Sequence, residues 1–188
     1  MFSVELKEKT LRVHQRLEKK LVTQIRQIRD ADGYADLLRL MYGFYAPLGE
    51  MVKPYLSQLN SGDRHASHIL DDIEYFTGSR SIPDVSSGLP NIRSFHSALG
   101  ATYVTEGSTL GGVIIAGMIS KLLGISADRG FSFFNAYGAD TKARWEIFKT
   151  YLDRPYSPDE KLQVTEAATS TFTTFNNWIT LNESASQR

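Results

Sequence analysis

The chain contains 188 residues, of which 41% are hydrophobic, so it is long enough to form one domain with a sizeable buried core. Its 21 basic and 21 acidic residues balance, which disfavours broad binding to nucleic acids or to anionic membranes. It contains no cysteine, and this excludes disulfides, thiolate metal sites and cysteine nucleophiles.

The first segment, residues 2–29, carries apolar residues at the three- and four-residue spacing of an amphipathic helix. His14 lies beside this apolar stripe, with Lys7 two turns before it and Glu18 one turn after it. A histidine in such a place either binds a metal or heme iron or, more commonly, is partly buried with a hydrogen-bond partner. Position alone leaves both interpretations of His14 open.

A second helix is predicted over about residues 33–59, after a turn in which Asp32 can act as the cap. Its aromatic stripe is typical of a core helix. Two prolines, Pro47 and Pro54, predict a kink or a break in it.

A turn at residues 60–63 leads to a third predicted helix, 64–76, in which His65 and His68 are three residues apart. This spacing can in principle hold a metal, but no third ligand lies near them in the sequence. Residues 77–90 are rich in Ser, Gly and Pro and have no helical period, so we expect a loop.

A long segment without proline, residues 91–123, is predicted to form one apolar helix although it contains Gly107, Gly111, Gly112 and Gly117. Each glycine costs roughly 1 kcal/mol relative to alanine, on the order of 4 kcal/mol in total. Gly107 and Gly111 are one turn apart and leave one face bare. That face either admits a flat ligand or packs closely against another helix, and the glycines also permit a bend.

Three further helices are predicted after Gly124, which ends the glycine-rich one. They span residues 127–137, residues 141–152, and a final segment that runs to about residue 181. The final helix begins at the Ser-Pro-Asp-Glu sequence of residues 157–160, a combination of cap, first-turn proline and third-position glutamate.

These patterns predict an all-α, single-domain, multi-helix bundle over residues 1–188, with a short polar tail from about residue 183. The N-terminus has no signal-peptide pattern, and glycines and Glu106 interrupt the most apolar segment, which argues against a membrane span. We therefore expect a soluble cytoplasmic protein without a membrane anchor.

Common motifs for nucleophiles and phosphate sites are missing: the sequence has no G-x-S-x-G, no Walker A loop and no H-E-x-x-H. No G-x-G-x-x-G follows a predicted strand. What remains is a histidine on one helix and a glycine-rich face on another, which together suit the two walls of a slot for a flat ligand.

Several motifs in order make the chain resemble the heme oxygenase family, of the bacterial, biliverdin-producing kind. The matching stretches are LKEKTLRVH at 6–14, YGFYAPL at 42–48, YVTEGSTLGG at 103–112, FFNAYG at 133–138, RWEIF at 144–148 and the apolar helix at 168–178. The resemblance covers nearly the whole chain, and its fold would sandwich heme between the first helix and the glycine-bent distal helix.

Roles follow from the resemblance by position. His14 would be the proximal ligand of the heme iron, and Glu18 matches a carboxylate close to it. The distal helix would present Gly107, Ser108, Gly111 and Gly112 to the heme. The other positions that match heme contacts are Lys7 and Lys149 at the propionates, Tyr103, Arg154, Phe172 and Phe175.

The chain departs from its relatives at two positions. Ser108 stands where mammalian-type members have an aspartate that organises water beside bound oxygen, although the Glu-Gly-Ser form occurs in bacterial relatives. Arg154 is displaced by one residue from the arginine of many relatives, and Asp153 occupies that place.

The activity that the resemblance implies is the oxidative opening of heme to biliverdin, with release of carbon monoxide and ferrous iron. Heme b would be both substrate and cofactor, and O2 would be the oxidant. Because no flavin or iron–sulfur motif is visible, electrons would come from a ferredoxin, a flavodoxin or a reductase. We expect the protein itself to be a monomer.

Two alternatives to this activity stay open. One is a non-catalytic heme-binding protein for storage, transfer or sensing, which would share His14 and the slot. The other is a thiaminase-like enzyme on the same helical fold, but that activity has no use for His14, and the chain lacks a cysteine nucleophile.

Overall fold

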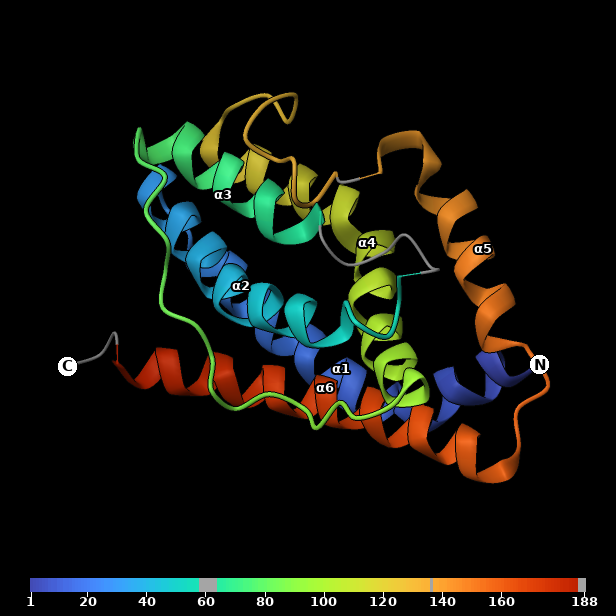
Figure 1. Ribbon diagram of the computed structural model, residues 1–188. Coiled ribbons are helices and arrows are strands. Elements are labelled where there is room, and N and C mark those ends of the chain that lie inside the picture. The colour runs from blue at the N-terminus through green and yellow to red at the C-terminus, as the bar shows by residue number, and fades with distance from the viewer. Residues whose placement is uncertain (58–63, 136, 186–188) are drawn as a thin grey trace.

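The computed structural model describes residues 1–57, 64–135 and 137–185, with the backbone alone at residues 64, 65, 184 and 185. It contains six α-helices and one short 3-10 helix (Figure 1): α1 Phe2–Gln27, α2 Ala31–Val52, α3 Arg64–Thr77, α4 Phe95–Leu123, η1 Gly138–Asp140, α5 Thr141–Leu152 and α6 Pro158–Ala185. These described ranges contain no strand, and the predicted all-α fold is confirmed.

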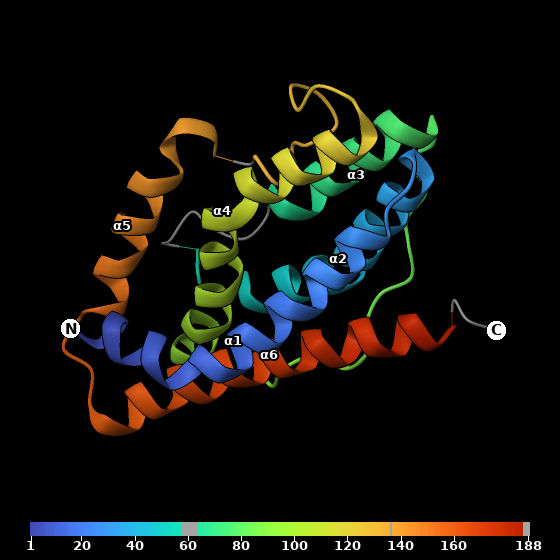
Figure 2. The same ribbon diagram turned by 180° about the vertical axis from the view of Figure 1, so that it is seen from behind.

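The helices pack around one apolar core, with α6 against both α1 and α4, and α2 against α3 (Figures 1 and 2). In both views α5 stands at the edge of the molecule, beside the N-terminal end of α1. The core is mainly aromatic and branched aliphatic, and its largest fully buried side chains include Tyr34, Phe44, Leu48, Leu99 and Phe175. No helix in the described part of the chain is long and apolar enough to cross a membrane.

Local capping explains several of the helix boundaries. The Ser157 hydroxyl accepts the N–H of Glu160 at 3.3 Å, and the Glu160 carboxylate accepts the N–H of Ser157 at 2.7 Å, so the predicted start of α6 is confirmed. Gly124 ends α4 in the left-handed region at φ 66°, as predicted. The predicted cap of α2 is wrong, because the carboxylate of Asp30, not that of Asp32, accepts the N–H of Gly33.

The second helix is shorter than predicted. It ends at Val52 instead of about residue 59, because Pro54 lacks the N–H that would continue the ladder. Pro47, by contrast, lies inside α2 without ending it. The predicted turn at residues 60–63 lies outside the described residues.

The helix predicted over residues 127–137 is absent from the described residues there, which form turns instead. Gly130 adopts a φ of +77°, which breaks a right-handed helix, and the backbone N–H groups of Ser132 and Phe133 donate to the Asp72 carboxylate on α3. Tertiary contacts therefore replace the helical hydrogen bonds that the local sequence favours.

Candidate functional site

His14 lies on α1 with its ring against α6. The imidazole stacks on Phe172, with ring centres 5.1 Å apart, and its Nε2 atom lies 3.2 Å from the Oε1 atom of Glu18. The side chain of His14 is 43% exposed, so one edge of an oriented ring stays accessible. Phe175 is one layer deeper, where it stacks on Phe44 of α2 at 4.4 Å.

The glycines of α4 have three different environments. A Cβ on Gly111 would meet no atom within 4 Å, so this residue faces open space. A Cβ on Gly107 would make ordinary contact with the Trp145 ring, at 3.6 Å. A Cβ on Gly112 would overlap the carbonyl oxygen of Phe134, so this glycine is needed for close packing against the turn segment, residues 130–135. Gly112 thus packs against a neighbouring backbone, whereas Gly111 does not.

The helix α4 remains continuous from Phe95 to Leu123 but changes direction near its middle in both ribbon views (Figures 1 and 2). The glycines cluster in this middle region, where a helix without Cβ atoms bends more easily. Gly117, one further turn along, also faces open space.

Ser108 accepts a hydrogen bond from Tyr45, which belongs to the aromatic stripe of the second predicted helix. The hydroxyl of Tyr45 donates to the Ser108 Oγ atom at 3.0 Å, and Ser108 donates in turn to the carbonyl of Thr105 at 2.6 Å. Burial and the nearby Glu106 carboxylate raise the pKa of Tyr45 to about 12, although the hydrogen bond with Ser108 opposes this shift. Tyr45 therefore remains a neutral donor at physiological pH.

Glu106 is itself buried, and the hydroxyl of Tyr137 donates to its Oε1 atom at 3.0 Å. The guanidinium of Arg144 lies over the Tyr137 ring at 4.5 Å. This polar group ties α4 to the segment that leads into α5. No sequence motif indicates the hydrogen bond between Tyr137 and Glu106, because these residues are 31 positions apart.

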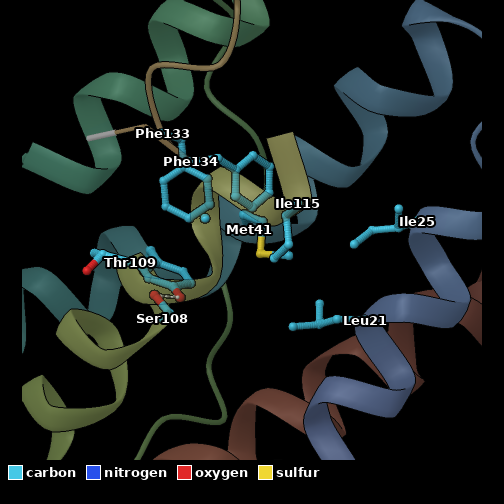
Figure 3. A pocket seen from close by; sticks show the side chains of 10 residues that line it. Leu21, Ile25, Met41, Ser108, Thr109, Ile115, Phe133 and Phe134 are labelled. Atoms are coloured by element: carbon cyan, nitrogen blue, oxygen red, sulfur yellow. Dashed lines mark hydrogen bonds between the residues drawn. The ribbon is translucent and has the colours of Figure 1, made fainter. Parts of the chain in front are cut away.

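A small apolar cavity of about 50 Å³ lies between α1, α2 and α4 (Figure 3). Figure 3 shows the α1 side chains across from those of α4 and the turn segment; the lining residues are Leu21, Ile25, Met41, Tyr45, Ser108, Thr109, Gly112, Ile115, Phe133 and Phe134. The inner faces of α1 and α4 therefore oppose each other, as the two walls of a slot must.

The same two helices meet at Tyr103. Its side chain is buried, its ring centre lies 5.8 Å from that of Trp145, and its phenol lies near Thr10 of α1. Burial raises the pKa of the Tyr103 phenol, and the nearby Thr10 side chain opposes that shift. Tyr103 thus bounds the space between α1 and α4 at the end near α5.

The predicted propionate ligands lie around that end. Lys7 is exposed on α1, and the Lys149 Nζ atom pairs with Glu146 at 2.9 Å on α5. Arg154 is exposed, and its guanidinium lies over the Tyr151 ring at 4.4 Å. The structure thus gives Arg154 an aromatic partner on α5.

The Asp153 side chain caps the N-terminus of α1. Its carboxylate accepts the backbone N–H of Ser3 at 2.8 Å and the hydroxyl of Ser3 at 2.9 Å. It thereby fastens the start of α1 to the end of α5, and a carboxylate also suits a helix N-terminus electrostatically. Sequence reasoning noticed Asp153 only as a departure from the family.

The structure gives no further support for a metal site at the histidines of α3. His65 has its side chain outside the described residues, and the Nδ1 atom of His68 is buried without a hydrogen-bond partner. Within the described ranges, no group of three or more His, Asp or Glu side chains could hold a bare metal ion.

Comparisons with known proteins agree on one family. The family model described as heme oxygenase matches residues 1–180. A heme oxygenase structure from Leptospira interrogans superposes with a TM-score of 0.77 and 18% identity, covering 96% of this chain and 98% of that one. NO- and CO-bound heme oxygenase from Neisseria meningitidis gives a TM-score of 0.73 at 19% identity, with coverages of 95% and 90%.

A third structure, heme oxygenase-1 of the cyanobacterium Synechocystis in complex with heme, has a TM-score of 0.75 at 15% identity, with coverages of 98% and 93%. At such identities the superpositions establish the fold. No curated protein sequence matches the chain.

Proposed function

The chain belongs to the heme oxygenase family, and from this premise we propose that it opens heme to biliverdin and releases carbon monoxide and ferrous iron. Heme b is the substrate and the cofactor, O2 is the oxidant, and electrons come from a separate donor. The solved relative with heme in its printed description supports the choice of ligand. We further propose that the protein acts in the cytoplasm as a monomer.

One observation carries the proposal: an oriented, accessible imidazole on α1 accompanies a residue without a side chain on α4. His14 is 43% exposed and stacked on Phe172, while Gly111 has no atom within 4 Å of where its Cβ would be. Open space at a glycine is what a flat macrocycle needs to approach a helix backbone. The Nε2 atom of His14 lies 3.2 Å from Glu18, so His14 would have to give up this contact to hold the iron through that atom.

The residues around heme then have distinct tasks. His14 would hold the iron through an imidazole nitrogen, which donates less electron density than a thiolate. When bound, heme supplies the iron that activates oxygen and the porphyrin carbon that is oxidised. Gly111, and Gly107 beside the Trp145 ring, would let the backbone of α4 lie close to a bound heme.

Polar residues orient the substrate and the water beside it. The Ser108 hydroxyl, held by Tyr45, keeps a hydrogen-bonding oxygen fixed at the distal face. Lys7 and Lys149 would bind the propionates at the edge near α5, and Arg154 would assist if it leaves the Tyr151 ring. Tyr103 would contact the heme beside them. Phe172 and Phe175 complete the apolar side of the slot.

The supply of electrons must be external, because the sequence has no flavin or iron–sulfur motif. A ferredoxin, a flavodoxin or a reductase is the class of donor that we propose. A non-catalytic heme carrier would use the same His14 and the same open face, so turnover is the property that separates the two functions.

The decisive experiment reconstitutes the protein with hemin, adds reductant and O2, and follows the Soret band and the product spectrum. We expect loss of the Soret band and formation of biliverdin. A Soret band that persists under turnover conditions would support the carrier instead.

His14→Ala should abolish the histidine-ligated spectrum and the turnover while the fold survives. His96→Ala is the matched control, because His96 lies 3.5 Å from Glu160 and contacts the Tyr156 ring at the far end of α4. If His96→Ala removes the spectrum and His14→Ala does not, the assignment of the ligand is wrong.

A further inference from the structure

A buried carboxylate on α3 holds the turn segment that follows α4. Asp72 is 1% exposed, and it accepts the backbone N–H groups of Ser132 and Phe133, each at 2.8 Å. Burying a carboxylate is costly unless it is hydrogen-bonded, and an apolar side chain in this place would leave the buried N–H of Phe133 without its acceptor. The two directed hydrogen bonds indicate that the side chain fixes the geometry of the backbone that it contacts.

The same segment has a second, separate attachment. The hydroxyl of Tyr34 donates to the carbonyl of Gly130 at 3.3 Å, and the ring of Phe76 occupies the space where a side chain on Gly130 would lie. This attachment lies at the beginning of the segment, two residues before the N–H groups that Asp72 holds. It therefore provides an internal comparison for the role of Asp72.

Beyond Asp72, the segment reaches the distal helix. The carbonyl of Phe134 lies so close to Gly112 that no side chain fits between them. The ring of Phe133 packs edge-on against Tyr45 at 5.2 Å, and Tyr45 donates to Ser108. Phe133 and Phe134 also line the apolar cavity beside Ser108 (Figure 3). A shift of residues 132–134 would thus disturb two contacts of the middle of α4: the packing of Phe134 on Gly112 and, through Phe133 and Tyr45, the hydrogen bond to Ser108.

We propose that Asp72 is a positioning residue for the distal side: by holding residues 132 and 133, it fixes the bent part of α4 and the Tyr45–Ser108 hydrogen bond. The catalytic role of Asp72 rests on the proposed function, but the contacts that connect Asp72 to α4 are present without heme. Asp72 lies on α3 and reaches α4 through the turn segment, whose N–H groups it accepts.

The first test uses the heme-free protein and hydrogen exchange of backbone amides. Asp72→Asn keeps the size of the side chain but replaces one acceptor oxygen with an NH2 group that cannot accept an N–H. We expect exchange to become about tenfold faster at residues 132–133 and at residues 108–112, a change of about 1.4 kcal/mol in the opening free energy. Asp72→Glu, which keeps both carboxylate oxygens, should restore slow exchange at both places.

Tyr34→Phe is the matched control, because it removes the Gly130 hydrogen bond and leaves the Asp72 contacts intact. It should leave exchange at residues 108–112 at the wild-type rate. Sucrose, which stabilises compact states, keeps the variants folded during the measurement. Fast exchange confined to residues 132–133 in Asp72→Asn, with α4 unchanged, overturns the proposal.

The second test adds heme and carbon monoxide, and records the C–O stretching band in the infrared. A variant that is merely less stable leaves the band of its folded molecules unchanged. Asp72→Asn should shift or broaden the band, and Tyr34→Phe should not; an unshifted band in Asp72→Asn contradicts a role at the distal side. If the wild type binds heme without opening it, the proposed function fails, while the exchange experiment still decides whether Asp72 positions α4.

Discussion

Replacing single glycines of α4 by alanine should have different effects on stability and activity, depending on what each glycine faces. Gly111 and Gly117 both face open space in the heme-free fold, whereas Gly112 faces the backbone of Phe134. The three variants add the same methyl group to the same helix. Differences among them therefore report the surroundings of each position.

The expected magnitudes follow from two opposing terms. Alanine is favoured over glycine in a helix interior by roughly 1 kcal/mol, so Gly111→Ala and Gly117→Ala should each stabilise the heme-free protein by about that amount. For a chain of this length, about 1 kcal/mol corresponds to a rise in Tm of roughly 2–4 °C. At Gly112 the new Cβ would lie 3.0 Å from the carbonyl carbon of Phe134 and overlap its oxygen. Overpacking against backbone costs about 1–3 kcal/mol, which exceeds the helical gain.

Heme turnover separates the two stabilised variants. Because Gly111 lies on the face that we assign to the distal wall, Gly111→Ala should lower the rate of heme opening by about tenfold or more, since small displacements near reacting atoms are costly. Gly111→Leu should block the site altogether. Gly117→Ala should keep the wild-type rate, although it gains the same stability.

The measurements are urea unfolding of the heme-free proteins and single-turnover conversion of bound heme. A wild-type rate in Gly111→Ala and Gly111→Leu would refute the distal-wall assignment and leave helix bending as the reason for this glycine. Stabilisation in Gly112→Ala would contradict the close contact with Phe134.

Three further predictions concern the edge and the core of the site. Lys7→Ala and Lys149→Ala should each bind heme within about tenfold of wild type, because exposed pairs contribute about 0–1 kcal/mol, yet alter the ratio of biliverdin isomers, measured by chromatography after one turnover. Tyr45 has its folded-state pKa raised from 10.0 to about 12, so its contribution to stability is complete below pH 10 and is lost as the pH rises through about 12. Urea unfolding at about pH 9 and about pH 12 should reveal a loss of up to about 3 kcal/mol from this group, and Tyr45→Phe should lack it. Asp153→Ala should destabilise the protein by about 0.5–2 kcal/mol through loss of the α1 cap on Ser3, and unchanged urea unfolding would contradict that contact.

The sequence by itself determined the helical character of the chain and most of the ends of its helices. Apolar spacing, the Ser-Pro-Asp-Glu start of α6 and the glycine end of α4 act within a few residues, so they can be recognised without the fold. His14 and the glycine pattern of α4 also stood out, because each is unusual for its place in a helix.

Only the tertiary structure determined what each glycine of α4 faces. Gly111 and Gly112 are neighbours in the sequence, yet one faces open space and the other a backbone carbonyl that lies 22 residues further along the chain. Local propensity also predicted a helix at residues 127–137, where Asp72 of a distant helix takes the backbone donors instead. The physical reason is common to both: a close contact or a hydrogen bond with a remote segment outweighs preferences of about 1 kcal/mol per residue, and the sequence does not reveal where the remote segment will lie.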